Sequence, residues 1–533
     1  MRFINILLLL MLWAPAVAGD VVARVRLDEA TRFGFPELIF GAQEEIYVLP
    51  YNSVDGLKRL KEMVGLRLLR YPCGTPSDWL AWDAVEEGYW PAFPKARKKL
   101  YPDAYIELAK QLGLEPLITV NTTLYGPHLD GIVNRVNPTK VESIRRGAEY
   151  AAKWVHHANV ENRSGVRYWE IGNEVWIWLQ GAEYANHVRE YSQAMREADP
   201  SIKLIACGLA HDAEFSPKWL KFPDDPNWTT RTVNRNTFDG WNEALLSLPE
   251  GTFDYIAQHV YLNLPDMEAL EGGKDVFASI HRAEVLNNTI AMIKKHNSPV
   301  RIAITEWMVN FHWEPFVTPH RIKKGTLTTQ EAEKVTLASS PANQFITTLL
   351  AADWMGRMIA SGYVDIAVGH TWINSLTRNW NYEAQKAIKP PLLEPAGAAM
   401  KFWSDHHGGQ VVPVTVEGGP SYVHEDETVP LISAYATTDR DKVYLVLINR
   451  SPDQTLAVNA ADLVAGQDAA TITEHVLSAP SWVASVWPTV EDSARYPIQE
   501  SSQVLATDTL GDYQLLPSRL VCLEASLTKS SGQ

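Results

Sequence analysis

Two glutamates stand out because each follows an apolar run and has polar neighbours. Glu174 ends the segment Gly172-Asn173-Glu174, and Glu306 lies in Thr305-Glu306-Trp307. A retaining glycosidase needs one protonated carboxyl for the leaving oxygen and an ionised one about 5–5.5 Å away that attacks the anomeric carbon. For either glutamate alone, an ion pair with an arginine such as Arg70 is the alternative. Two such glutamates together favour a catalytic pair.

Other polar and aromatic residues close further apolar runs, and we expect them to surround the two glutamates. They are Arg70, Asn121, His259, Tyr261, Trp307 and Trp372. Either tryptophan could be a packing wall or a platform for a sugar. His211, His259 and His370 raise the alternative of a metal-dependent amidohydrolase, but its His-x-His pair is missing from the first run, Phe40-Gly41-Ala42-Gln43. We therefore expect no metal ligands and no cofactor.

The elements that must position these residues alternate along the chain. Eight apolar runs rich in Val, Ile and Leu are typical of strands buried on both faces. Amphipathic stripes between them predict helices, for example around Leu57–Val64, Val141–Val155 and Ile280–Ile293. This alternation predicts a (β/α)8 barrel over residues 36–405. An open doubly wound sheet is the alternative, but it would carry a glycine-rich turn after the first strand. The runs are Leu38–Gly41, Leu66–Pro72, Glu115–Asn121, Val166–Glu174, Ile202–Gly208, Phe253–Tyr261, Val300–Trp307 and Val364–Trp372.

The composition changes after residue 405. Short β-rich segments such as Leu431–Thr437 and Lys442–Ile448 are separated by turn residues, which predicts an all-β sandwich over residues 406–533. An alternating segment, Val21–Leu27, precedes the barrel. We expect residues 19–35 to add a strand to the sandwich.

The N-terminus resembles a secretory signal. Arg2, the apolar run Phe3–Trp13 and the small residues Ala16-Val17-Ala18 predict a cleavable segment over residues 1–18, and therefore a secreted or periplasmic protein. The rest of the sequence contains no run of about 20 apolar residues, so no membrane span is predicted. The three cysteines cannot build a disulfide scaffold, and whether two of them pair stays open.

The overall composition limits the kinds of molecule that the protein is expected to bind. The formal net charge of −15 argues against a nucleic-acid partner, because phosphate binding needs a basic surface. Tryptophan is abundant, with 19 residues, and indole faces stack on sugar rings. The sequence predicts a carbohydrate partner, with neither nucleic acid nor membrane, and leaves the oligomeric state open.

Several motifs together resemble a known family. Tyr168–Trp176 (YWEIGNEVW) and Ile304–Trp307 (ITEW) are similar to the acid/base and nucleophile motifs of clan A glycoside hydrolases. The segments Leu69–Thr75 (LRYPCGT), His259–Tyr261 (HVY) and Ala198–Ala206 (ADPSIKLIA) resemble family 51, the α-L-arabinofuranosidases. The resemblance covers the barrel, and the layout of a barrel with a β-sandwich fits the whole mature chain.

The resemblance implies a role for each matched residue. Glu174 would be the acid/base and Glu306 the nucleophile, Arg70 would keep Glu306 ionised, and Asn173 would bind a sugar hydroxyl. His259 and Tyr261 would line the site, and Trp372 would form its hydrophobic floor. Either Glu44 or Glu45 would bind the substrate. The chain departs from the family at Cys73-Gly74-Thr75, where Gly-Gly-Asn is usual.

The function expected from the resemblance is retaining hydrolysis of plant or algal saccharides by double displacement, with an α-L-arabinofuranoside as substrate. Other clan A activities, namely β-xylosidase, endo-β-glucanase or a uronic-acid-specific glycosidase, are alternatives. A non-catalytic carbohydrate-binding protein is an alternative of another class. The presence of both glutamates together with Asn173 disfavours it.

Overall fold

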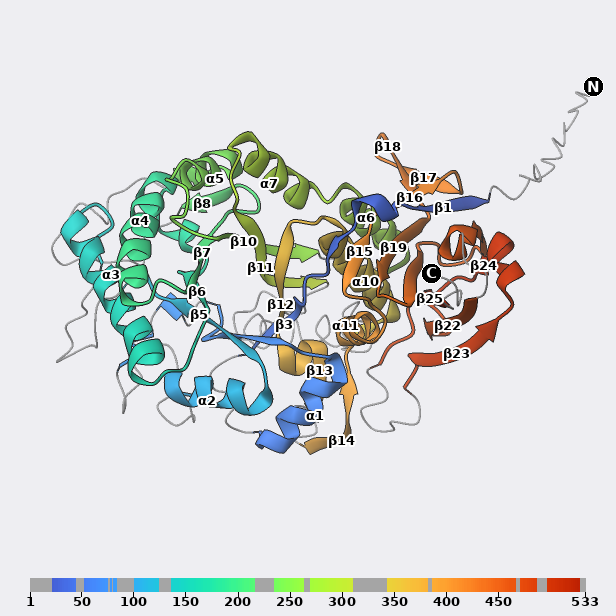
Figure 1. The fold of residues 1–533 in the computed structure, drawn as a ribbon, viewed down its shortest axis with the longest axis horizontal. Helices are drawn as coiled ribbons and strands as arrows, with labels where there is room; N and C mark the ends of the chain where they lie inside the picture. Colours follow the sequence, from blue (N-terminus) through green and yellow to red (C-terminus); the bar gives the residue numbers. More distant parts are fainter. Residues whose placement is uncertain are drawn as a thin grey trace, which may run out of the picture.

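The structure is a computed structural model. It describes residues 22–44, 52–74, 77–78, 80–83, 100–123, 136–215, 234–262, 269–309, 343–381, 386–465, 470–486 and 496–527. In Figure 1 a barrel surrounded by helices lies beside a group of β-sheets formed mainly by the C-terminal part of the chain.

Eight parallel strands close the barrel in chain order, one on each of the eight apolar runs, so the expected (β/α)8 barrel is confirmed. Its interior is filled by residues such as Leu68, Leu117, Ile205 and Ile366, while alternate residues pack against the helices outside. The strands are β3 (Leu38–Gln43), β4 (Leu68–Tyr71), β5 (Glu115–Val120), β6 (Tyr168–Ile171), β7 (Lys203–Cys207), β10 (Tyr255–Leu262), β11 (Arg301–Val309) and β12 (Val364–His370).

Helices pack on the outside of the barrel (Figure 1). Helix α1 shows why they form where they do: the side chain of Ser53 caps its first turn, Gly65 ends it in a left-handed conformation, and Leu57, Leu60 and Val64 are buried. No helix of the described residues is long and apolar enough to cross a membrane. The helices are α1 (Val54–Val64), α2 (Pro102–Leu112), α3 (Val141–Val155), α4 (Gly181–Ala198), α5 (Phe238–Leu246), α6 (Ala269–Arg282), α7 (Glu284–Lys295), α10 (Phe345–Ala360) and α11 (Pro395–Asp405).

The structure differs from the sequence-based expectation between β10 and β11. The single helix expected around Ile280–Ile293 is two helices, because Ala283 has a φ of 45° and interrupts the helical path. Ile280 lies on α6, whereas Leu286 and Ile293 are buried on α7. An apolar stripe at helical spacing does not reveal such a bend when neither glycine nor proline marks it.

Two sheets form the β-sandwich. Val25, Val458 and Leu515 of a four-stranded sheet pack against Leu445 and Leu523 of a seven-stranded sheet. The four strands are β16 (Val414–Glu417), β1 (Ala23–Leu27), β21 (Leu456–Asn459) and β24 (Tyr513–Leu515). The seven are β2 (Phe33–Gly34), β15 (Gln410–Val412), β19 (Ile432–Thr438), β20 (Lys442–Asn449), β25 (Arg519–Leu527), β22 (Ala470–Ser478) and β23 (Gln499–Leu505).

In the described part of the chain, three smaller pairs of strands lie outside the barrel and the sandwich. They are β8 (Ala213–Phe215) with β9 (Asn234–Asn236), β13 (Thr377–Asn381) with β14 (Lys386–Leu393), and β17 (Ser421–His424) with β18 (Glu427–Pro430).

A buried ion pair joins the barrel to the sandwich. Asp353 on α10 accepts hydrogen bonds from Arg450 Nε at 2.8 Å and from the Tyr435 hydroxyl at 2.6 Å. Arg450 and Asp353 are both almost completely buried. Because an unpaired buried charge is costly, this contact favours one fixed docking of α10 on the seven-stranded sheet.

Candidate active site

The two glutamates lie at the C-terminal ends of barrel strands. Glu306 is on β11 and is only 4% exposed. Glu174 follows β6, where Gly172 turns the chain with a φ of 78°; a Cβ there would lie 2.5 Å from the Val175 side chain. Glu174 itself has a φ of 46°, and its side chain is 29% exposed. A left-handed conformation is uncommon at a residue with a side chain and is enriched at active sites.

The two carboxylates face each other with His259 between them. One oxygen of Glu174, one oxygen of Glu306 and Nδ1 of His259 all lie within 4.8 Å of one another. Glu306 pairs with His259 in the register of β11 and β10, which brings the ends of these strands together. The spacing suits direct attack on an anomeric carbon and is shorter than the 6.5–9.5 Å that an inverting enzyme needs for a water.

Arg70, at the end of β4, lies beneath this pair and is completely buried. Its Nη1 donates to Glu306 Oε1 at 2.8 Å and to Gln43 Oε1 at 2.5 Å, and its Nη2 donates to Asn173 Oδ1 at 2.8 Å. Its Nε donates to Glu170 Oε2 at 2.7 Å. Burial opposes the charge of Arg70, but Glu170 and Glu306 raise the pKa of the guanidinium above its ordinary value.

The surroundings of Glu306 keep it ionised. The Tyr261 hydroxyl donates to Glu306 Oε2 at 2.5 Å. Burial opposes ionisation, but the charges of His259 and Arg70 outweigh it and hold the pKa of the Glu306 carboxyl well below its usual range. This lowered pKa favours the ionised form of Glu306.

His259 contacts both carboxylates. Its Nδ1 lies 3.0 Å from Glu174 Oε1 and 3.5 Å from Glu306 Oε2, and its Nε2 lies 3.2 Å from the Thr305 hydroxyl. Burial disfavours the imidazolium, but Glu306 and Glu174 raise the pKa of His259 above its ordinary value. The half-buried Trp176 packs edge-on against the ring, with the centroids 5.6 Å apart.

Four residues predicted from strand ends or by the resemblance lie around the site, two of them hydrogen-bonded to the backbone and two of them buried in the core. The Asn121 amide donates to the carbonyl of Leu80, and Glu44 accepts from the amide of Ile373 at 2.6 Å. Trp307 and Trp372 are completely buried. These contacts and this burial favour a supporting position for all four.

The structure also adds residues that the sequence analysis did not single out. Glu170 and Gln43 hold Arg70, and Thr119 donates to Glu170 Oε2 at 2.6 Å. Asp78 is buried nearby; burial first, and then the charge of Glu174, raise the pKa of its carboxyl well above the ordinary value. A polar residue inside an apolar run, such as Glu170, was the available signal.

Two positions from the family resemblance, Thr75 and Glu45, fall outside the described residues. Glu174, His259 and Glu306 are the group of possible metal ligands found among the described residues, and His211 and His370 are not part of it. Each of the three side chains already has hydrogen-bonding partners within the site.

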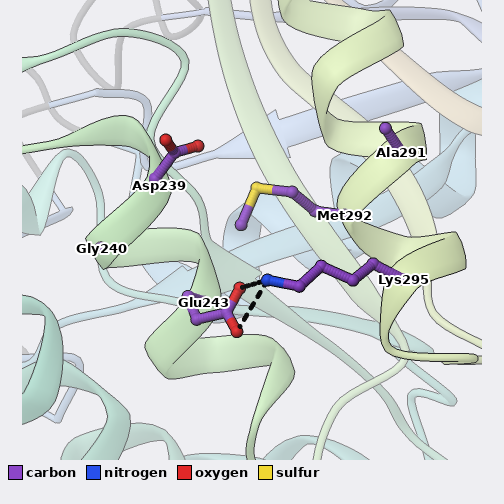
Figure 2. Close-up of a pocket in the computed structure, with 6 residues that line it drawn as sticks. All are labelled: Asp239, Gly240, Glu243, Ala291, Met292 and Lys295. Atoms are coloured by element: carbon purple, nitrogen blue, oxygen red, sulfur yellow. Dashed lines mark hydrogen bonds and ion pairs between the residues drawn. The ribbon is translucent and has the colours of Figure 1, made fainter.

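A separate surface hollow of about 470 Å³ lies between α5 and α7. Figure 2 shows that Lys295 reaches across it to Glu243, with Nζ 3.0 Å from Oε2. Both side chains are exposed to solvent, and no strand-end glutamate lines the hollow. It is therefore no part of the candidate active site.

Comparison with known proteins shows similarity to α-L-arabinofuranosidases. Residues 86–245 match the family model "Alpha-L-arabinofuranosidase 1 domain". Proteins named intracellular exo-alpha-(1->5)-L-arabinofuranosidase are 22% identical: the one from Streptomyces lividans aligns over 80% of this chain and 62% of its own length, and one from Bacillus subtilis over 80% and 82%. The chain thus spans less than two thirds of the Streptomyces relative.

These names contradict one expectation. The secretory signal over residues 1–18 and a secreted or periplasmic location were predicted from an apolar run, but these relatives are named as intracellular enzymes. The segment itself lies outside the described residues. The prediction of secretion is wrong, because it conflicts with the intracellular relatives.

The pairing of the cysteines was left open by the sequence. Cys73, Cys207 and Cys522 are buried and form no disulfide with one another.

The fold comparison covers almost the whole chain. The solved structure of α-L-arabinofuranosidase from Thermotoga maritima, an arabinose complex, superposes with a TM-score of 0.65 at 18% identity and covers 95% of this chain and 100% of the other. At this identity the likeness establishes the fold. Together with the family model and the motifs, it confirms the expected resemblance: the chain is similar to α-L-arabinofuranosidases, including a solved family 51 enzyme, and has their fold.

Proposed function

We propose that this protein is a retaining glycoside hydrolase that acts on α-L-arabinofuranosides, with its site in the barrel of residues 36–405. The observation that carries the proposal is the close approach of two carboxylates in unequal surroundings. Glu306 is buried against Arg70 and Tyr261, whereas the Glu174 side chain is 29% exposed. The unequal surroundings separate an ionised nucleophile from a carboxyl that exchanges protons with leaving group and water.

The residues then act in two steps. Glu306 attacks the anomeric carbon while Glu174 gives its proton to the departing oxygen. Water then attacks the same carbon, the bond to Glu306 breaks, and Glu174 takes the proton of that water. Asn173 supports the sugar: because Arg70 can only donate, Asn173 Oδ1 must face it, which leaves Nδ2 to donate to a substrate hydroxyl.

We expect Glu306→Ala to lower kcat by a factor on the order of 10⁴ or more, because no covalent intermediate can form. The variant should fold, since Arg70 keeps Glu170 as a buried counterion. Initial rates on an aryl glycoside and a thermal melt test this. Glu243→Ala, in the surface hollow, is the matched control and should retain activity; turnover by Glu306→Ala at the control rate would contradict the assignment.

Glu174→Ala should slow substrates with poor leaving groups by about 10²–10⁴-fold, and activated aryl glycosides far less in the first step. Azide should accelerate the second step, because it needs no general base, and give a glycosyl azide that retains the anomeric configuration. Steady-state rates on paired leaving groups and NMR of the product measure both effects. Equal losses on both substrates without an azide adduct would point to a different acid.

The substrate assignment is tested by comparing kcat/KM on nitrophenyl α-L-arabinofuranoside, β-D-xyloside, β-D-glucoside and β-D-glucuronide. We expect the arabinofuranoside to be best by at least about tenfold, near 1.4 kcal/mol of discrimination. Cys73, with a φ of 82°, replaces a glycine usual in the family and makes this a demanding test. A better rate on any of the other three would overturn the arabinofuranoside while leaving the catalytic pair in place.

A further inference from the structure

The guanidinium of Arg70 is shared between two carboxylates. Besides its bonds to Glu306, Gln43 and Asn173, its Nε and Nη2 both lie 2.7 Å from Glu170 Oε2. Of the five N–H groups of the guanidinium, four donate hydrogen bonds to these residues, and Nη2 also forms an ion pair with Glu170. Its single positive charge is thus divided between Glu306 and Glu170.

Glu170 is placed where it can affect the reaction without touching a substrate. It lies within β6, four residues before Glu174, and is completely buried. Its Oε2 also accepts from the Thr119 hydroxyl at 2.6 Å, and Thr119 is its neighbour in the register of β5 and β6. Oε1 has no hydrogen-bond partner among the described residues.

We propose that Glu170 is a positioning residue that sets the reactivity of Glu306 by competing with it for Arg70. This inference rests on the proposed function, because it requires Glu306 to be the nucleophile. A carboxylate that receives more positive charge is more stable, so it attacks more slowly and departs more readily. By holding part of the charge of Arg70, Glu170 keeps Glu306 reactive enough to attack.

The two chemical steps then respond in opposite directions. In the first step Glu306 loses negative charge as its oxygen bonds to the anomeric carbon and the electron pair of the broken bond moves to the leaving oxygen. In the second step, water bonds to that carbon and the electron pair returns to Glu306. Removing the charge of Glu170 should therefore slow the first step and accelerate the second. A general loss of active-site order would slow both.

The test is Glu170→Gln. This variant keeps the shape of the side chain, and its amide oxygen can still accept a hydrogen bond from Arg70. The probe is the dinitrophenyl 2-deoxy-2-fluoro derivative of the glycoside that the unmodified protein prefers, which separates trapping of the enzyme from its reactivation. We expect trapping to be about three- to tenfold slower and reactivation faster by a similar factor. Slowing of both steps, or an unchanged ratio between them, would overturn the proposal.

Matched variants separate this effect from the loss of a buried ion pair. Asp353→Asn neutralises an equally buried carboxylate whose partner, Arg450, lies at the junction with the sandwich. It should lower the melting temperature and leave the ratio of the two steps unchanged; a changed ratio would contradict the inference. Glu170→Asp keeps the charge and should return the ratio towards that of the unmodified protein.

A second variant covers the possibility that Glu170→Gln does not fold. Thr119→Val removes one donor from Glu170 Oε2, which should strengthen the hold of Glu170 on Arg70 and accelerate trapping relative to reactivation. A shift in the other direction would overturn the inference. Absence of any trapping of the unmodified protein would instead contradict the proposed function itself.

Discussion

The guanidinium of Arg70 is buried among the ends of four barrel strands, and the site depends on how its charge is balanced. Gln43 comes from β3, Glu170 from β6, Asn173 from the segment directly after β6, and Glu306 from β11. Burying such a cation costs several kcal/mol unless its partners are well placed. The same contacts that offset this cost also fix the position of Glu306 relative to the segment that carries Glu174. Stability and chemistry therefore rest on the same set of hydrogen bonds.

The barrel provides this arrangement through register. Gln43 lies beside Arg70 in the pairing of β3 with β4, and His259 lies beside Glu306 in the pairing of β10 with β11. Parallel strands place these residues at the same end, and Gly172 lets the chain turn so that Glu174 faces Glu306. The result is one buried carboxylate held ionised and a second, more exposed one that faces it.

The eight strands were predictable because Val, Ile and Leu runs buried on both faces are distinctive, and a strand-end rule then pointed to Glu174 and Glu306. The partners of Arg70 were not predictable. A polar residue inside an apolar run, such as Glu170, shows that it needs a buried partner, but the sequence does not show which distant strand lies beside it. Trp307 and Trp372 show the same limit: an aromatic residue at a strand end is equally compatible with a core position, and both are buried. The bend at Ala283 was not predictable either, because no glycine or proline marks it in the sequence.

The dependence of Glu306 on Arg70 is tested most directly by the acid limb of kcat/KM for Arg70→Met on an activated aryl arabinofuranoside. The lowered pKa of Glu306 means that activity is lost only as pH falls through that low value. Without the guanidinium, Glu306 and Glu170 repel each other, so we expect the acid limb to rise above about 4.3, the usual pKa of glutamate. The double variant Arg70→Met/Glu170→Gln removes both charges and controls for folding. It should shift the acid limb part of the way back towards that of the unmodified protein. An acid limb that is the same in Arg70→Met and the unmodified protein would contradict the central role of Arg70.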